Sequence, residues 1–382
     1  MKVKYCGPAR DYSGYGEANR HDIGALSKAG IQLVTELPSY VRDMAEFGWL
    51  GKLVTELENN GLGYEYKILH TTPDQYRRYM EQDVYHIGRL FWETDKIPKE
   101  FADNAKLMDE IWTGSQFNAD AIRRAGVEDV PIYIIPEAVD VSLEVDKIKP
   151  YRLTIDKGYT FYSIFEWTER KNPRALLESY WREFEGVEGV NLIIKTYVDN
   201  FTDEKKQEIK QQIRKLKSQL QLKSYAPVYL YLDLMDRHQI YRFHQTGDCF
   251  VSAHRGEGWG IPQMEALLMG KTIISTNLGG VHEYLTDGKD ALLVDCDMVQ
   301  ITQNTRNPQW YAADQHWGEI NKDSLREKLR WAFENKAKAV KLGKEGRKTV
   351  IKEFSLEAVG QKMKQRLTDI ENERLNIMRA EQ

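Results

Sequence analysis

The stretch Glu257-Gly258-Trp259-Gly260-Ile261-Pro262-Gln263-Met264-Glu265 places two carboxylates on either side of a glycine-rich turn that opens a helix. Gly258 and Gly260 have no Cβ, so the backbone can turn sharply and come close to a ligand. Pro262 has the fixed φ and the missing N–H that suit a helix's first turn. The stretch therefore predicts a strand-to-helix turn, the basic unit of an α/β fold.

The same stretch also predicts a ligand. Free amides at a helix N-terminus attract an anion such as phosphate, but carboxylates do not bind phosphate. They accept hydrogen bonds from hydroxyls, and the hydroxyls beside a diphosphate are those of ribose and sugar. We therefore favour a sugar-nucleotide site over the simpler alternative, a Gly-Pro turn before an amphipathic helix in which Glu265 stabilises the first turn.

The residues on either side extend the pattern along the chain. Residues 271–276 (KTIIST) indicate a buried strand, and residues 277–283 (NLGGVHE) form another glycine-rich turn into a helix. Residues 254–294 as a whole resemble the donor-site signature of the retaining GT-B glycosyltransferases of family four, in which seven residues separate two glutamates. Residues 111–127 (IWTGSQFNADAIRRAGV) with 132–140 (IYIIPEAVD), and residues 169–180 (ERKNPRALLESY), resemble two further segments of that family.

The resemblance implies an α/β protein with the GT-B fold, in which two doubly wound, Rossmann-like domains face a cleft. Residues 1–150 would form an N-terminal acceptor-side domain, completed by a C-terminal helix over residues 356–382. Residues 151–355 would form the nucleotide-sugar (donor) domain. The helical spacing of Val359, Met363, Leu367 and Ile370, with Ser355 as N-cap, supports a terminal helix.

The spacing of β-branched and aromatic runs independently predicts parallel sheets, because these runs alternate with longer amphipathic segments. The polar segment 141–157 separates the two halves and is interpreted as an interdomain linker. The predicted strands are 2–6, 31–35, 66–70, 84–87, 110–113, 132–135, 159–164, 190–195, 228–232, 249–252, 272–275 and 291–294.

The resemblance also assigns roles in the donor domain. Glu257 would orient the donor sugar and Glu265 would bind ribose, with Gly258, Trp259, Gly260 and Ile261 supplying the turn and its amides. Arg170 and Lys171 follow a predicted strand and would bind the diphosphate, since Arg forks onto phosphate oxygens and Lys acts as a point charge. One position departs from the family: Glu166 stands where many relatives carry a further Arg.

In the first half of the chain the candidates are fewer. Gly14 and Gly16, after the first predicted strand, allow a backbone nest against phosphate or acceptor. His86 at the end of a predicted strand, and His70 at the end of the preceding one, are candidates for contacting donor or acceptor, although isolated histidines are more often structural. The family's front-face mechanism implies that no protein nucleophile is needed.

Composition sets further limits. The 382 residues exceed the about 250–300 that one core supports, so two domains are expected. We find no apolar run of membrane-spanning length and no signal peptide, which predicts a cytoplasmic enzyme, in contact with a membrane at most at its surface. Cys6, Cys249 and Cys296 are too scattered for a zinc site or a disulfide framework. No metal and no permanently bound cofactor is expected.

The partners predicted are a nucleoside-diphosphate sugar and an unidentified hydroxyl acceptor: glycan, lipid, protein or modified nucleic acid. The basic helix over residues 205–223 is a candidate for contact with an anionic surface, although a net charge of -4 makes a solvated face the default. The alternatives to a transferase are a GT-B sugar-nucleotide epimerase, a phosphorylase, and a binding protein without turnover. Acceptor choice is expected to lie in the loops around 38–51 and 73–89.

Overall fold

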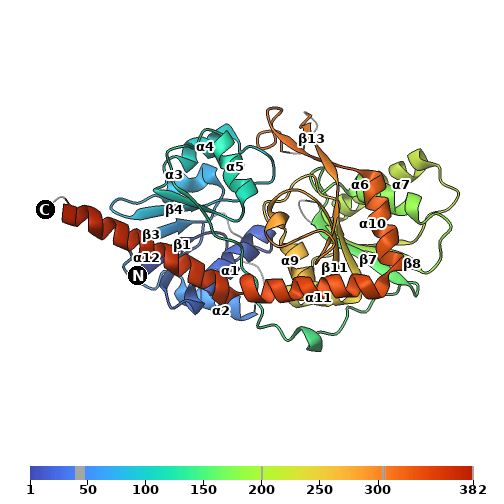
Figure 1. Ribbon diagram of the computed structural model, residues 1–382, viewed down its shortest axis with the longest axis horizontal. Coiled ribbons are helices and arrows are strands. Elements are labelled where there is room, and N and C mark those ends of the chain that lie inside the picture. The colour runs from blue at the N-terminus through green and yellow to red at the C-terminus, as the bar shows by residue number, and fades with distance from the viewer. Residues whose placement is uncertain (39–47, 199–200, 303–304, 306, 381–382) are drawn as a thin grey trace. The chain divides into compact units, whose positions relative to one another are not determined.

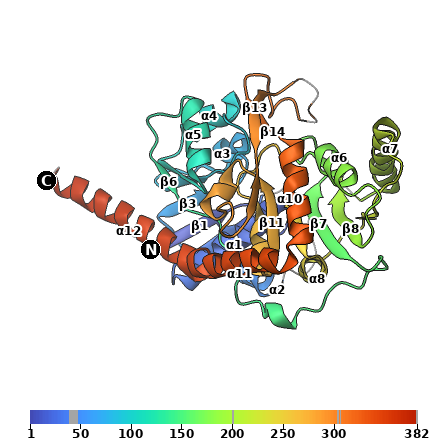
Figure 2. The same cartoon turned by 45° about the vertical axis from the view of Figure 1, so that its right-hand side comes forward.

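The computed structural model describes residues 1–38, 48–198, 201–302, 305 and 307–380. The chain divides into two compact units (Figures 1 and 2). Unit 1 combines Met1–Leu143 with Ile351–Gln382, and unit 2 is Glu144–Val350. None of the helices in the described part of the chain is long and apolar enough to cross a membrane.

Unit 1 contains a six-stranded parallel sheet in the order β2-β1-β3-β4-β5-β6. Its strands are β1 (Lys2–Cys6), β2 (Gln32–Glu36), β3 (Tyr66–Leu69), β4 (Tyr85–Arg89), β5 (Glu110–Thr113) and β6 (Ile132–Ile134). Its helices are α1 (Gly14–Lys28), α2 (Gly48–Leu57), η1 (Pro73–Gln75), α3 (Tyr76–Tyr79), α4 (Lys99–Ala105), α5 (Gln116–Arg124) and α12 (Leu356–Ala380).

The last helix, α12, packs into the core of unit 1 although it comes from the other end of the chain. Val359, Met363, Leu367 and Ile370 are buried in the same cluster as residues of α1, β1 and β3. Gly360 lets α12 approach α1 closely, because a Cβ there would lie 2.1 Å from the Ala25 carbonyl oxygen. Ser355 precedes the helix, and its hydroxyl accepts a hydrogen bond from the Ala358 amide, as an N-cap does.

Unit 2 contains a second six-stranded parallel sheet, in the order β12-β11-β10-β7-β8-β9. Its strands are β7 (Tyr159–Glu166), β8 (Val190–Tyr197), β9 (Val228–Tyr231), β10 (Cys249–Ser252), β11 (Thr272–Thr276) and β12 (Leu292–Val294). Its helices are η2 (Val145–Lys147), α6 (Pro173–Glu183), α7 (Asp203–Leu220), α8 (Arg237–Thr246), α9 (Ile261–Leu268), η3 (Gly280–Glu283), α10 (Lys322–Glu334) and α11 (Lys336–Glu353), whose last three residues belong to unit 1.

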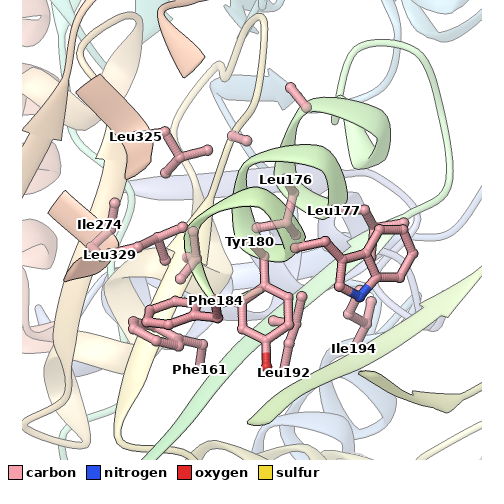
Figure 3. Packing of buried hydrophobic residues seen from close by; sticks show 14 of the residues in the cluster. Phe161, Leu176, Leu177, Tyr180, Phe184, Leu192, Ile194, Ile274, Leu325 and Leu329 are labelled. Carbon is pink, nitrogen blue, oxygen red and sulfur yellow. The ribbon is translucent and has the colours of Figure 1, made fainter. Parts of the chain in front are cut away.

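The core of unit 2 lies between this sheet and the helices α6 and α10. Figure 3 shows Leu176, Leu177 and Tyr180 of α6, and Phe184 directly after this helix, against side chains of β7 and β8, with two leucines of α10 beside them. Trp181 is also fully buried, and its indole N–H donates to the Ala226 carbonyl. A buried Trp with its N–H satisfied contributes a large apolar area without an unpaired polar atom.

A two-stranded antiparallel hairpin, β13 (Cys296–Gln300) and β14 (His316–Ile320), follows β12. Neither strand is among those predicted from the sequence, so the hairpin is a correction. Cys296, Asp297 and Met298 alternate poorly between buried and exposed positions, and Met298 is 45% exposed. A strand whose side chains are mostly solvated lacks the period-two hydrophobic pattern that would have revealed it.

Candidate functional site

The second sheet changes direction between β7 and β10, because the chain winds outward from β7 to β9 and then returns to β10 beside β7. Ligands of open α/β sheets bind outside the carboxyl ends of the strands at such a switch point. The loop after β7 carries Arg170 and Lys171, and the loop after β10 carries Glu257. The topology therefore brings Arg170 and Lys171 next to Glu257, although Lys171 and Glu257 are 86 residues apart in the chain.

These three side chains form one ionic cluster. The Lys171 ammonium donates a hydrogen bond to Glu257 Oε1, and Arg170 Nη1 lies 3.6 Å from Glu257 Oε2. Arg170 Nη1 also donates to the Gly256 carbonyl oxygen, at 2.8 Å. Burial alone would raise the pKa of Glu257, but the charges of Lys171 and Arg170 overcome this and lower it to about 2. Glu257 is therefore ionised at any pH at which the protein would work.

The loop over residues 167–172, which carries Arg170 and Lys171 and is called the cation loop here, has a defined local structure. Asn172 adopts a left-handed conformation, with φ 52°, and its side chain caps α6 by accepting from the Ala175 amide. Pro173 follows in the first turn of the helix, where its missing N–H costs nothing. The Arg170 carbonyl accepts from the Arg255 amide at 2.6 Å, so the loop is tied to the one that carries Glu257.

The loop over residues 253–260, which carries Glu257 and is called the carboxylate loop here, needs glycine where the backbone turns sharply or comes close to another segment. Gly260 precedes α9 with φ 95°, a conformation that side chains other than glycine rarely adopt. Gly280 lies against the first turn, since a Cβ on it would be 2.0 Å from the Gly258 carbonyl oxygen. The Gly280 amide donates to the Glu257 carbonyl at 2.9 Å. Two glycine-rich turns thus hold each other in place.

Trp259 has a buried side chain, and Ile261 begins α9. The Trp259 side chain is 4% exposed and packs against Tyr284 and the Met264 sulfur. The Tyr284 hydroxyl donates to the carbonyls of Trp259 and Gly260. Ile261 is the first residue of α9, so its amide and that of Gly260 belong to the free N-terminal end of the helix. The Trp259 indole is therefore a core side chain of unit 2.

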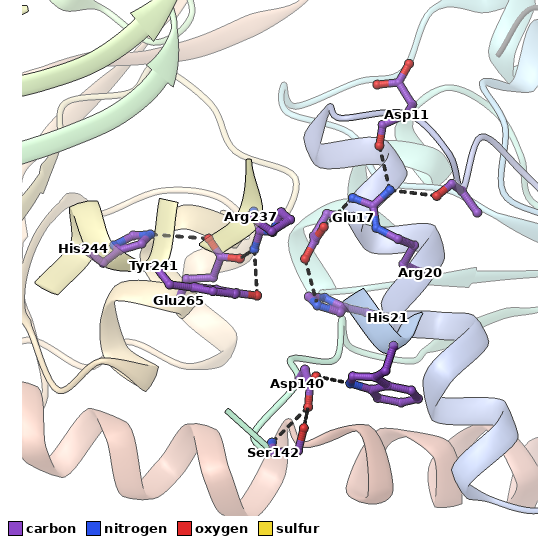
Figure 4. Close-up of polar contacts among 12 residues, drawn as sticks. Asp11, Glu17, Arg20, His21, Asp140, Ser142, Arg237, Tyr241, His244 and Glu265 are labelled. Atoms are coloured by element: carbon purple, nitrogen blue, oxygen red, sulfur yellow. Dashed lines mark hydrogen bonds and ion pairs between the residues drawn. The ribbon is translucent and has the colours of Figure 1, made fainter. Parts of the chain in front are cut away.

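Glu265 is held by two residues that the sequence did not suggest. In Figure 4, Arg237 of α8 donates to Glu265 Oε1, and His244 Nε2 lies 3.4 Å from Oε2. Arg237 also donates to the Tyr241 hydroxyl at 3.0 Å. Burial lowers the pKa of His244 although Glu265 acts to raise it. Glu265 is the fifth residue of α9, beyond the first turn, so the alternative role of first-turn charge is wrong for it.

Arg237, Tyr241 and His244 were present in the sequence at helical spacing. Residues four and seven positions apart share one face of a helix, so the run from 237 to 244 predicts one polar face on α8. What the sequence did not contain was the partner of this face. The contact with Glu265 arises because α8 packs against α9, 28 residues later in the chain.

His254, next to the cation cluster, is fully buried and neutral. Burial lowers its pKa to about 3, against the opposing charge of Glu257. Its Nε2 is 3.3 Å from the Ser275 hydroxyl, and its Nδ1 has no hydrogen-bond partner among the described residues. It contributes no charge to the site.

In unit 1, Gly14 and Gly16 lie at the start of α1. Ser13 caps the helix by accepting from the Gly16 amide, and Gly16 is packed so tightly that a Cβ would lie 2.2 Å from the Asp11 carbonyl oxygen. Gly14 has open space around it. Arg20 holds this segment by donating to the carbonyls of Ala9 and Asp11, each at 2.7 Å. Figure 4 shows Arg20 beside Asp11.

The two histidines singled out in unit 1 have different positions. His70 directly follows β3 at the carboxyl edge of the sheet, where Nδ1 contacts the Tyr5 hydroxyl at 2.6 Å and Asp22 at 3.5 Å. His86 was predicted to end its strand, and this is wrong. It is the second residue of β4, at the opposite edge, and its Nε2 accepts from the Glu81 amide.

Several of the basic side chains on the predicted basic helix, α7, have partners within unit 2. On α7, Lys206 pairs with Asp233, Lys205 with Glu208, and the Lys217 ammonium lies over the rings of Trp181 and Tyr225. No group of three or more potential ligands that could hold a metal ion occurs among the described residues. Most of the loop over 38–51 lies outside the described residues.

Residues 148–305 match the family model described as "Glycosyl transferases group 1". The protein is a glycosyltransferase. This confirms the predicted enzyme class, and the two parallel six-stranded sheets with their flanking helices confirm the predicted GT-B α/β fold. No curated protein matches the sequence.

Solved structures support the fold of this glycosyltransferase over nearly its whole length. The sucrose-phosphate synthase of Thermosynechococcus elongatus aligns with TM-score 0.69 and 15% identity, covering 97% of this chain and 99% of the other. HepE of Anabaena, solved with UDP and glucose, aligns with TM-score 0.66 and 14% identity, covering 96% and 99%. A glycosyltransferase of Rickettsia africae aligns with TM-score 0.65 and 14% identity, covering 97% and 98%.

Proposed function

We propose that the protein is a retaining glycosyltransferase of family four that moves a sugar from a nucleoside-diphosphate sugar to a hydroxyl acceptor. The observation that carries the proposal is the cluster of Lys171, Arg170 and Glu257 at the switch point of the second sheet. Cations for a diphosphate and a carboxylate for sugar hydroxyls stand side by side there, next to a helix N-terminus. The complex of HepE with UDP-glucose is consistent with such a donor.

In this proposal Arg170 and Lys171 neutralise the diphosphate as it leaves. Negative charge on the leaving phosphate grows toward the transition state, so fixed cations stabilise the transition state more than the bound donor. The backbone amides of residues 258–261, at and just before the N-terminus of α9, add further donors. Two protein cations supply the charge that a metal ion would otherwise bring, so the reaction needs no metal.

Glu257 orients the sugar in this mechanism and does not attack it. A carboxylate whose two oxygens face Lys171 and Arg170 is held as a hydrogen-bond acceptor. The leaving diphosphate takes the proton of the acceptor hydroxyl as the acceptor attacks the same face of the sugar, and the anomeric configuration is kept. Glu265, fixed by Arg237 and His244, accepts hydrogen bonds from the ribose hydroxyls.

The acceptor side belongs to unit 1 in this proposal, with the loop that carries Gly14 and Gly16 after β1 and His70 after β3, both at the carboxyl edge of that sheet. The proposal assigns no role to His86. We also propose that the enzyme works in the cytoplasm. The acceptor itself is a hydroxyl compound to be found by experiment.

The test is donor turnover without metal. The purified protein is incubated with UDP-, GDP-, ADP- and TDP-sugars in EDTA, and free nucleoside diphosphate is measured for the wild type, Glu257→Ala and Glu169→Ala. Glu169 is an exposed carboxylate one residue before Arg170 and serves as the matched control. We expect release from one donor, loss of release in Glu257→Ala and retention in Glu169→Ala.

The same assay separates the alternatives. An epimerase would convert the donor to an isomer without releasing diphosphate, and a phosphorylase would act only with added phosphate. A non-catalytic protein would bind a donor without turnover in any variant. Once an acceptor is found, the anomeric coupling constant of the product by NMR reports retention or inversion. No release and no binding with any donor would refute the proposal.

A further inference from the structure

We infer that Glu257 determines specificity, by making the site bind a sugar-bearing diphosphate in preference to a bare nucleoside diphosphate. In the free protein its carboxylate forms ion pairs with Arg170 and Lys171, the two cations that would bind a diphosphate. This inference rests on the proposed function, because it takes Arg170 and Lys171 as the diphosphate ligands. It goes beyond it by assigning Glu257 a repulsive role in addition to its contact with the sugar.

The cluster is preassembled and shielded from water. The side chains of Lys171, Arg170 and Glu257 are 14%, 16% and 8% exposed. Charge interactions are screened little at such positions, so the attraction of Glu257 for the two cations is strong, and so is its repulsion of any anion that approaches them. A diphosphate therefore meets two cations that already have a counter-charge.

The backbone holds Glu257 where it is. Its carbonyl accepts from the Gly280 amide at 2.9 Å, and Gly279 lies so close that a Cβ there would be 2.4 Å from the same oxygen. The turn at Gly279 and Gly280 thus fixes the backbone of Glu257, and the carboxylate can move only by rotation of the side chain. His254, whose pKa is lowered by burial to about 3, remains neutral and cannot compensate the charge.

The two kinds of ligand have different consequences. A bare diphosphate that pairs with Lys171 and Arg170 leaves Glu257 buried, ionised and deprived of its partners, which is unfavourable. A nucleotide sugar brings hydroxyls beside the diphosphate, and these donate hydrogen bonds to the carboxylate that the cations have released. After transfer the sugar is gone while the diphosphate remains, so repulsion by Glu257 promotes product release.

The decisive measurement is the ratio of two dissociation constants, that of the bare nucleoside diphosphate and that of the matching nucleotide sugar. Both are determined by titration calorimetry without acceptor, with UDP, GDP, ADP and TDP and one sugar derivative of each. The wild type is compared with Glu257→Gln, which removes the charge and keeps the shape. Glu169→Gln is the matched control, because its carboxylate is exposed and in the same loop.

We expect Glu257→Gln to bind the bare diphosphate about tenfold more tightly than the wild type does, because a buried like charge has been removed. The nucleotide sugar should bind no more tightly than before, so that the ratio collapses. Glu169→Gln should leave the ratio unchanged. If Glu257 only contributed a favourable contact, Glu257→Gln would weaken binding of the ligand and would not tighten binding of the bare diphosphate. Glu257→Ala, which also removes the charge but offers no amide to Lys171, should change the ratio in the same direction.

Unchanged or weaker binding of the bare diphosphate by both Glu257 variants, with folded protein by circular dichroism, would overturn the inference. The proposed function would stand in that case if the wild type still released diphosphate from a donor. If Glu169→Gln tightened binding of the bare diphosphate equally, the inference would also be overturned. The effect would then come from the lower net negative charge of the protein and not from the position of Glu257. Absence of any binding by the wild type would overturn both the inference and the proposed function.

Discussion

Arg255 Nε lies 2.7 Å from Glu319 Oε2, and this ion pair joins the hairpin β13–β14 to the loop that carries Glu257. The Arg255 carbonyl accepts from the Gly318 amide at 2.7 Å, and its guanidinium lies over the Trp317 ring. Arg255 also donates through Nη1 to the Glu169 carbonyl at 2.7 Å. One arginine thus connects the hairpin, the cation loop and the carboxylate loop.

The first prediction concerns this connection. Glu319→Gln should lower kcat for transfer by about tenfold, since small misplacements of reacting groups have large effects on rate. The Kd for donor should change less, because Glu319 does not itself contact the ligand in the proposed mechanism. Glu319→Asp should recover part of the rate. The measurement is kcat and donor Kd in the same preparation.

The matched control is Asp297→Asn. Asp297 is exposed on the same hairpin and stands directly opposite Glu319 in the antiparallel register. Like charges at opposed positions repel, so this change should leave kcat unchanged and stability unchanged or slightly higher. If Asp297→Asn and Glu319→Gln gave the same loss of rate, the ion pair with Arg255 would not be the cause.

The second prediction concerns Lys171. Lys171→Met removes one of two cations at the leaving group, and kcat should fall by about 10²–10³-fold, the range typical for loss of one such stabilising group. Lys215→Met, an exposed lysine on α7, is the control and should retain full activity. Activity of Lys171→Met within threefold of the wild type would show that this ammonium does not act on the diphosphate.

Most of the fold could be predicted from the sequence, because buried parallel strands appear as short β-branched and aromatic runs. Strands β1, β5 and β10 have the predicted bounds. The hairpin was missed because its first strand is mostly solvated. The position of His86 was wrong because β4 starts one residue later than predicted and ends two residues later, which moves the histidine from the end of the strand to its beginning.

For the candidate site, the sequence indicated which residue types handle phosphate and sugar, but not how they are paired. That Lys171 contacts Glu257 depends on β10 returning to lie beside β7. That Arg237 contacts Glu265 depends on the packing of α8 on α9. Pairings of this kind follow from tertiary structure, and local patterns carry no information about them.

The third prediction separates packing from ligand binding at the first glycine-rich loop. Gly16→Ala should destabilise unit 1 by about 1–3 kcal/mol, because the new Cβ would overlap the Asp11 carbonyl. Gly14→Ala meets open space and should leave the thermal midpoint within about a degree, since a compatible Gly-to-Ala change is neutral or slightly stabilising.

The informative readout is activity at Gly14. If the backbone of this loop approaches substrate as proposed, Gly14→Ala should raise KM for donor or acceptor while stability stays constant. If Gly14→Ala were fully active, Gly14 would not belong to the site. The only role left for Gly16 would then be its structural one. Both variants are compared by differential scanning calorimetry and by transfer kinetics.

The last prediction is a pH dependence of stability. Glu137 is 2% exposed, and its Oε2 has no hydrogen-bond partner among the described residues. Burial and the neighbouring charge of Asp22 raise its pKa to about 8, although Arg89 acts in the opposite direction. The ordinary pKa of a glutamate is 4.5. Between these values the folded state keeps a proton that the unfolded state has lost, so stability falls as pH rises from about 4.5 to about 8.

Glu137→Gln removes this titration and keeps the shape of the protonated side chain. Relative to the wild type, its free energy of unfolding should be nearly unchanged at pH 4.5 and higher by about 1–4 kcal/mol at pH 8. The measurement is urea unfolding at pH 4.5, 6 and 8, with Glu128→Gln, an exposed glutamate of unit 1, as the control. A stability difference that did not grow with pH would mean that Glu137 ionises normally in the folded protein and that Arg89 compensates its charge.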